Sequence, residues 1–212
     1  QHATITIEQE SGSVKEISST YYQFGRKDAM PGTDNIFDGY FNKNGGDNMS
    51  VTNGIQHPGT FYTDGSTWVY NYSQYNLWSM DNTTNGFNDK SVVKTIYDPC
   101  PAGFHMPASN AFTGFTTNGQ NKGPMNVSGA WDYGWNFNNK ISSPDATVYF
   151  PESGYRHCGD GSLFQVGRGG YYWMAVPELQ LNGCSLLCGL LYVGSQHYAV
   201  RSYGYSVRPV SE

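Results

Sequence analysis

Alternation of apolar and polar residues marks several short strands in this chain. Ala3-Thr4-Ile5-Thr6-Ile7 alternates at every position, as a half-buried strand does. Tyr21–Gly25 forms a short aromatic strand candidate. Aromatic and β-branched residues then concentrate in the last third, which predicts strands at 147–150, 171–176, 185–193 and 203–210.

The last of these strands has two distinct faces. Tyr203, Tyr205 and Val207 fall on one side, and Ser206 and Arg208 fall on the other. The segment 159–162, Gly-Asp-Gly-Ser, has the composition of a turn joining two strands and lacks the periodic acids of an EF-hand calcium loop.

Helical periodicity is confined to short segments. Ser109 or Asn110 can cap a helix in which Phe112 and Phe115 lie on one face, and Gly114 keeps that helix short. A second short helix is predicted near 76–78. No long run of Ala, Leu, Glu and Lys predicts a longer helix.

Glycine, asparagine and aspartate dominate residues 31–90, where isolated aromatics indicate long loops anchored by single rings. Residues 1–12 are interpreted as the last strand or linker of a preceding domain, and 13–212 as one domain. The alternative is that 3–7 is the first strand of this same domain.

Composition narrows the class of protein. The 212 residues carry a net charge of −5, 16% aromatic residues and only 12 scattered basic residues, which disfavours nucleic-acid binding. No stretch approaches the roughly 18 apolar residues of a membrane span. The low charge and high aromatic content are typical of a folded, loop-rich domain.

The sequence offers no strong catalytic or metal motif. Cys100, Cys158, Cys184 and Cys188 allow three disulfide pairings, and unpaired buried thiols are as good an alternative. Their spacing relative to His105 and His157 does not fit structural zinc. No nucleophile elbow or phosphate loop is present, so we expect no cofactor, no metal and no enzyme activity.

Three segments, taken in order, carry a resemblance. They are Tyr21–Asp28, Asp98–Pro107, and a run from Tyr149–Arg156 through Gly170–Trp173 to Arg201–Val210. Together they resemble the Fibrobacter succinogenes major paralogous domain, common at the C-termini of fimbrillin-like surface proteins of Bacteroidales. The resemblance covers about residues 20–212.

That resemblance implies an α+β, C-type-lectin-like fold that is loop-rich, with antiparallel strands and two short helices. It also implies an adhesive role at the bacterial cell surface or pilus, extracellular, with contacts to other surface subunits through an upstream domain. The calcium-dependent sugar motifs of animal lectins are missing, so calcium-mediated sugar binding is not implied.

The C-terminal third also resembles the variable proteins of diversity-generating retroelements, in which asparagine codons are randomised. Every asparagine except Asn182 precedes Lys140, and erratic residues stand between constant-looking ones. The alternative is ordinary drift in a fast-evolving adhesin together with a buried apolar strand at 186–193.

We therefore predict that the domain binds an unknown protein or glycan on a cell surface through its C-terminal face. The candidate contact residues share an irregular character or an aromatic ring in that region: His157, Cys158, Phe164, Arg168, Trp173, Cys184, Leu187, Leu190, Leu191, His197, Tyr198, Val200 and Tyr203. A structural pilus subunit without a ligand, or an enzyme related to formylglycine-generating enzymes, are the alternatives.

Overall fold

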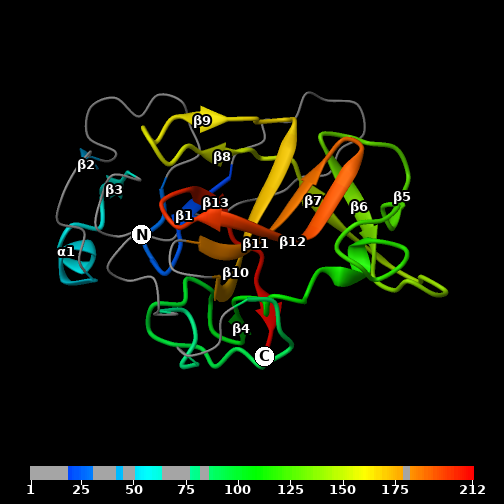
Figure 1. Cartoon of the computed structure of the whole chain (residues 1–212), viewed down its shortest axis with the longest axis horizontal. Helices are drawn as coiled ribbons and strands as arrows, with labels where there is room; N and C mark the ends of the chain where they lie inside the picture. Colours follow the sequence, from blue (N-terminus) through cyan, green and yellow to red (C-terminus); the bar gives the residue numbers. More distant parts are fainter. Residues whose placement is uncertain (1–18, 31–41, 45–50, 64–76, 82–85, 179–181) are drawn as a thin grey trace.

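A mixed β-sheet of seven strands forms the centre of the molecule (Figure 1). This computed structural model describes residues 19–30, 42–44, 51–63, 77–81, 86–178 and 182–212, of which 42–44 and 51 are described by backbone alone. The predicted strand at 3–7, the domain boundary at residue 12 and Asn76 lie outside those ranges.

The central sheet has the order β12-β11-β10-β13-β8-β9, and β1 pairs with β13. Only β10 and β13 run parallel; the other neighbours are antiparallel. The strands are β1 (Tyr21–Gln23), β8 (Tyr155–Arg156), β9 (Leu163–Phe164), β10 (Gly169–Glu178), β11 (Asn182–Gly189), β12 (Tyr192–Val200) and β13 (Gly204–Ser206).

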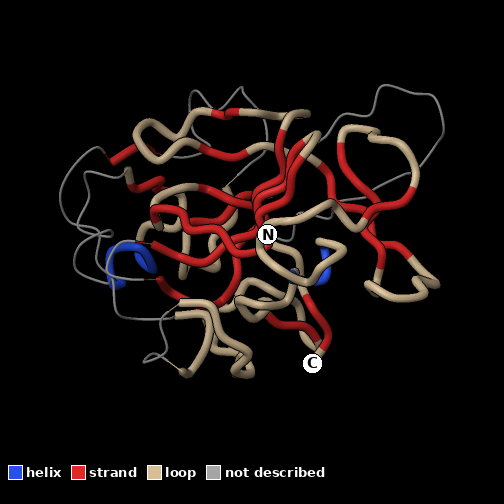
Figure 2. Tube along the Cα trace, turned by 45° about the vertical axis from the view of Figure 1, so that its right-hand side comes forward, coloured by secondary structure: helices blue, strands red, loops and turns tan. Residues whose placement is uncertain are grey.

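Three smaller sheets surround it (Figures 1 and 2). An antiparallel sheet contains β5 (Val127–Ser128), β6 (Gly134–Asn138) and β7 (Thr147–Pro151). β4 (Phe104–His105) pairs with β14 (Val210–Ser211), and β2 (Asn42–Asn44) pairs in parallel with β3 (Thr60–Tyr62). The helical elements are α1 (Val51–Gln56) and a 3-10 turn, η1 (Thr113–Phe115).

β10 is buried on both faces, which explains why its sequence reads as a continuous aromatic and apolar run. Tyr172, Met174 and Val176 pack into one core cluster. Trp173 and Ala175, on the other face, pack into a second cluster with Phe24, Trp78 and Tyr205. The strand thus joins the two halves of the core.

The first cluster lies between the central sheet and the β5-β6-β7 sheet. Phe115 stacks on Phe137 with ring centroids 4.0 Å apart, and Phe150 meets Phe112, Phe115, Phe137 and Tyr172 edge-on. Such edge-to-face pairs add to the stabilisation that comes from burying the rings.

The expected α+β, C-type-lectin-like fold with two short helices is wrong, because the described residues form mostly β-sheet, with one α-helix of six residues. The expected antiparallel pairing holds for most strand pairs, but β10 pairs in parallel with β13 and β2 with β3. The helix predicted from Ser109 is only the 3-10 turn η1, since the Ser109 hydroxyl bonds the backbone of Asn88 instead of capping a helix.

The strand predictions fared better. The expected strands at 147–150 and 171–176 are confirmed as parts of β7 and β10, and the 159–162 turn joins β8 to β9. The strand predicted at 203–210 is interrupted, because β13 covers only 204–206 and β14 begins at Val210. Tyr203, Tyr205 and Val207 nevertheless all pack into the second cluster. The single strand predicted at 185–193 is wrong, because the chain turns at Leu190 and Leu191 and divides it between β11 and β12.

Among the residues that the structure describes, no helix has the length and apolar character needed to cross a membrane.

Candidate binding surface

Four aromatic side chains gather at one end of the central sheet. Tyr155 of β8 stacks on Phe164 of β9 at 6.0 Å and meets Tyr203 edge-on at 5.4 Å. His157 lies 5.3 Å from Phe164 and 5.8 Å from Tyr203. We call Tyr155, His157, Phe164 and Tyr203 the aromatic cluster. The structure therefore brings together three of the predicted contact residues.

The short β8–β9 hairpin holds these rings in place. Tyr155 pairs with Phe164 in register, so both rings project from the same face. In the connecting turn, Asp160 accepts hydrogen bonds from the backbone and hydroxyl of Ser162 and lies 3.5 Å from His157 Nδ1. The buried Arg156 guanidinium donates to the Gly161 carbonyl from below. The cluster thus stands on a braced turn rather than on a loose loop.

The cluster continues into the core through Tyr171. This ring lies 4.6 Å from Tyr155 and 5.2 Å from Tyr205, and its hydroxyl donates to Gln165 Oε1. The exposed fraction of the residues falls along this path, from 45% at Phe164 to 7% at Tyr171. Burial raises the pKa of Tyr155, Tyr171 and Tyr205, so these phenols remain neutral and provide contact area rather than acid-base chemistry.

The β11–β12 hairpin carries a second group of predicted residues. Leu187 faces Tyr171 across the strand pair and packs at the edge of the second core cluster. Leu190 and Leu191 form the hairpin tip, where Leu191 is 87% exposed. Leu190 and Leu191 are therefore surface groups, whereas Leu186 and Val193 on either side of them are buried.

The remaining candidates are exposed or half-buried and lie on β12 or in the turn before β10. Tyr198, on the edge strand β12, stacks on Phe87 at 4.8 Å. His197 and Val200 are half-buried on the same strand, and burial lowers the pKa of His197. Arg168 is exposed in the turn before β10.

Three predicted contact residues are core residues instead. Cys158, Trp173 and Cys184 are buried, and the Trp173 indole donates to the Tyr22 carbonyl. Their side chains cannot reach a ligand in this structure. The sequence prediction missed Tyr155 and Tyr171, which both lie in the segments that carry the family resemblance, 149–156 and 170–173.

The four cysteines form no disulfide, and all are buried. Burial raises the pKa of Cys184 and of Cys188 to about 12, which keeps both thiols protonated near neutral pH. Among the described residues, no three histidine, cysteine or acidic side chains gather closely enough to hold a metal ion.

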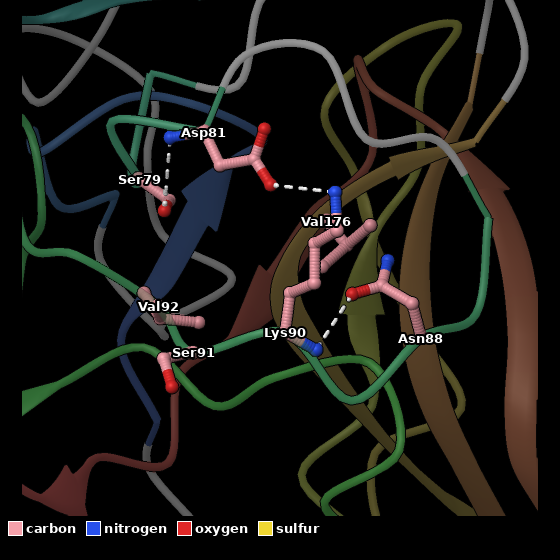
Figure 3. Close-up of a pocket in the computed structure, with 7 residues that line it drawn as sticks. All are labelled: Ser79, Asp81, Asn88, Lys90, Ser91, Val92 and Val176. Atoms are coloured by element: carbon pink, nitrogen blue, oxygen red, sulfur yellow. Dashed lines mark hydrogen bonds and ion pairs between the residues drawn. The ribbon is translucent and has the colours of Figure 1, made fainter.

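A small hollow on another part of the surface is lined by Ser79, Asp81, Asn88, Lys90, Ser91, Val92 and Val176 (Figure 3). The space in it accommodates about one water molecule, far less than a ligand pocket. Its polar groups are already engaged with one another: Asn88 accepts from the Lys90 backbone, and the Lys90 ammonium lies 3.6 Å from Asp81. This hollow is therefore a weaker candidate than the aromatic cluster.

Comparisons with protein families, curated proteins and solved structures found none that matches this chain.

Proposed function

We propose that this domain is an extracellular adhesin domain of a bacterial cell surface or pilus tip, which binds a protein or glycan through the aromatic cluster. The observation that supports this most directly is the group of half-exposed rings on the braced β8–β9 hairpin. Tyrosine and other aromatic side chains supply a large, rigid contact area at low entropic cost, as they do in antibody paratopes.

The surroundings of the cluster also suit binding. Phe164 and the hairpin tip at Leu190 and Leu191 expose apolar surface, which in soluble proteins often marks an interaction site. The sequence motifs that resemble fimbrillin-like surface proteins, and their order along the chain, support an adhesive role. Burial of the protonated Cys184 and Cys188 thiols favours binding over cysteine-dependent catalysis.

The test is binding of the purified chain to a combined glycan and host-protein array. Phe164→Ala and Tyr203→Ala should each weaken binding by about tenfold or more, because buried aromatic contacts dominate such interfaces. Ile96→Ala is the matched control, since Ile96 is 79% exposed but lies outside the cluster.

Near-ultraviolet circular dichroism must show that every variant keeps the native packing. Equal binding by the cluster variants and the control would contradict the proposal. Absence of any binding, combined with concentration-dependent assembly of the chain, would instead favour a structural subunit.

A further inference from the structure

A buried carboxylate lies behind the turn that precedes β10. Glu152, directly after β7, is 0% exposed, and neither of its carboxylate oxygens has a hydrogen-bond partner. No basic residue in the described part of the chain forms an ion pair with it. An uncompensated buried charge is costly, so such a group either stays neutral or has a cationic partner.

The surroundings of this carboxylate are aromatic. The indole N–H of Trp131 lies close enough to the carboxylate to offset part of the burial-induced rise in the Glu152 pKa. It does not reach hydrogen-bond geometry with Glu152, and its Nε1 is buried without another partner. Tyr149, Tyr171 and Tyr192 lie close enough for the Glu152 charge to add to the burial that raises their pKa. Aromatic rings and a carboxylate are the groups that proteins use to bind organic cations.

Two strained turns enclose the site. The backbone N–H of Glu152 donates to the Tyr133 carbonyl, and the Gly167 N–H donates to the Glu152 carbonyl. Tyr133 and Gln165, one in each turn, are two of only three described non-glycine residues with positive φ, at 53° and 56°. Strained backbone of this kind clusters at binding sites.

Tyr133 is the exposed residue that the Glu152 backbone contacts directly. Its side chain is 48% exposed and packs against Trp131, with ring centroids 4.8 Å apart. Trp131 and Tyr133 lie outside the strands, so these two rings can rotate without breaking a strand pair. The exposed rim nearby is apolar and contains Val166, Leu190 and Tyr192, which suits the alkyl chain that carries a cationic group.

We propose that Glu152 and Trp131 form a binding site for an alkylammonium or alkylguanidinium group. The site goes beyond the proposed function, because it is built on different residues from the aromatic cluster and is tested separately. A single carboxylate among aromatic rings supplies too few oxygen ligands for Mg²⁺ or Ca²⁺, which favours an organic cation over a metal ion.

The test titrates the purified chain with n-butylammonium and n-butylguanidinium chloride, with n-pentanol as a neutral probe of similar size. Tryptophan fluorescence and thermal unfolding serve as readouts. The cations should change both for the wild-type chain, whereas the alcohol should not. Glu152→Gln, which keeps the shape of the side chain, should weaken cation binding by about tenfold or more.

Glu178→Gln is the control, because Glu178 is also buried but accepts a hydrogen bond from Asn182. That variant should bind the cations as the wild-type chain does. A lysine-containing peptide and the same peptide with acetylated lysine then distinguish the side chain of a partner protein from a free small cation. Tighter binding of the unmodified peptide than of n-butylammonium would indicate a protein partner.

Two results would overturn the proposal. One is equal cation binding by Glu152→Gln and the wild-type chain. The other is no response of the wild-type chain to either cation, together with a more stable Glu152→Gln variant, which would identify Glu152 as a protonated core group. Because Phe164→Ala and Tyr203→Ala leave Glu152 in place, a failure here is distinguishable from a failure of the aromatic cluster.

Discussion

The backbone at the start of the β8–β9 hairpin requires glycine at position 154. Gly154 has φ of +72°, and a Cβ added there would overlap the Phe164 carbonyl oxygen. We expect Gly154→Ala to lower the free energy of unfolding by about 3 kcal/mol or more, because it adds a backbone clash to the strain of the left-handed conformation. Urea denaturation measures the change.

Gly103→Ala is the matched comparison, since Gly103 has φ of +81° and nothing lies within 4 Å of an added Cβ. Only the left-handed strain remains there, so the cost should be about 1 kcal/mol. Equal costs at the two positions would show that the chain relaxes around Gly154.

His197 makes stability depend on pH. Burial lowers the pKa of this imidazole, and its Nδ1 has no hydrogen-bond partner. The unfolded chain therefore takes up a proton first as the pH falls. This contribution to stability is complete above about pH 6.5 and declines below it.

The prediction is checked by comparing the wild-type chain with His197→Gln. The difference between their free energies of unfolding should change between pH 7.5 and pH 5.5, roughly one unit either side of the ordinary histidine pKa. The raised pKa of Glu152 has the opposite effect, because protonation of this carboxyl stabilises the folded chain as the pH falls. Both proteins contain Glu152, so its contribution cancels from the difference. A constant difference would place His197 in a solvated site.

Among the elements, β12 is the edge strand of the central sheet, and edge strands invite pairing with other chains. Here a side chain occupies part of the edge, because Asn121 Oδ1 accepts the backbone N–H of Gln196. The Gln196 side chain in turn donates to Asn110 Oδ1. These contacts protect the middle of β12 from pairing with another chain.

Asn121→Ala should therefore speed amide hydrogen exchange at Gln196 and cost about 1 kcal/mol of stability. Asn118→Ala is the control, because Asn118 is exposed and bonds only the neighbouring backbone of Gln120 and Lys122. Faster association of the Asn121 variant would also indicate that the edge has been opened. Unchanged exchange at Gln196 would show that this side chain does not protect the edge.

Sequence patterns predicted some elements correctly and missed others. β10 was found because both of its faces are buried and its apolar run is continuous. The β11–β12 turn was missed because the turn residues Leu190 and Leu191 are both apolar, and Gly189 alone did not mark a break in the apolar run. The helix at Ser109 failed because a distant partner, Asn88, engages the capping hydroxyl.

The candidate site was predicted only in part, because its contacts join residues that are distant in the sequence. Ring contacts joining His157, Phe164 and Tyr203 depend on the pairing of β8, β9 and β13, which no local pattern specifies. Glu152 gave no signal at all, because a single acid beside a proline and a serine is typical of a turn.

Taken as a whole, the molecule buries all four thiols without joining any of them. We expect no thiol of the native chain to react with a thiol-specific aromatic disulfide reagent within minutes, because all four are buried. Burial also raises the pKa of Cys100, Cys184 and Cys188. All 4 should react once denaturant is added. Rapid reaction of one thiol in the native state would reveal local opening.

The hypothesis of a diversified C-terminal third concerns the whole domain. Positions such as Leu191 and Phe164 can vary without touching the core, whereas Cys184 and Cys188 are 0% exposed. The coding sequence provides the test. Codons at the exposed positions should end in one fixed base if adenines in a template are randomised, and mixed third bases there would contradict the hypothesis.

The hairpin tip at Leu190 and Leu191 has a practical consequence for engineering. Gly189 and Tyr192 pair directly across it, so the two leucines are the whole of the connection. Each doubling of a flexible loop costs only about 0.6 kcal/mol in closure entropy. A foreign peptide inserted between the two leucines would leave the strand register unchanged, which makes the domain a scaffold for displaying grafted epitopes.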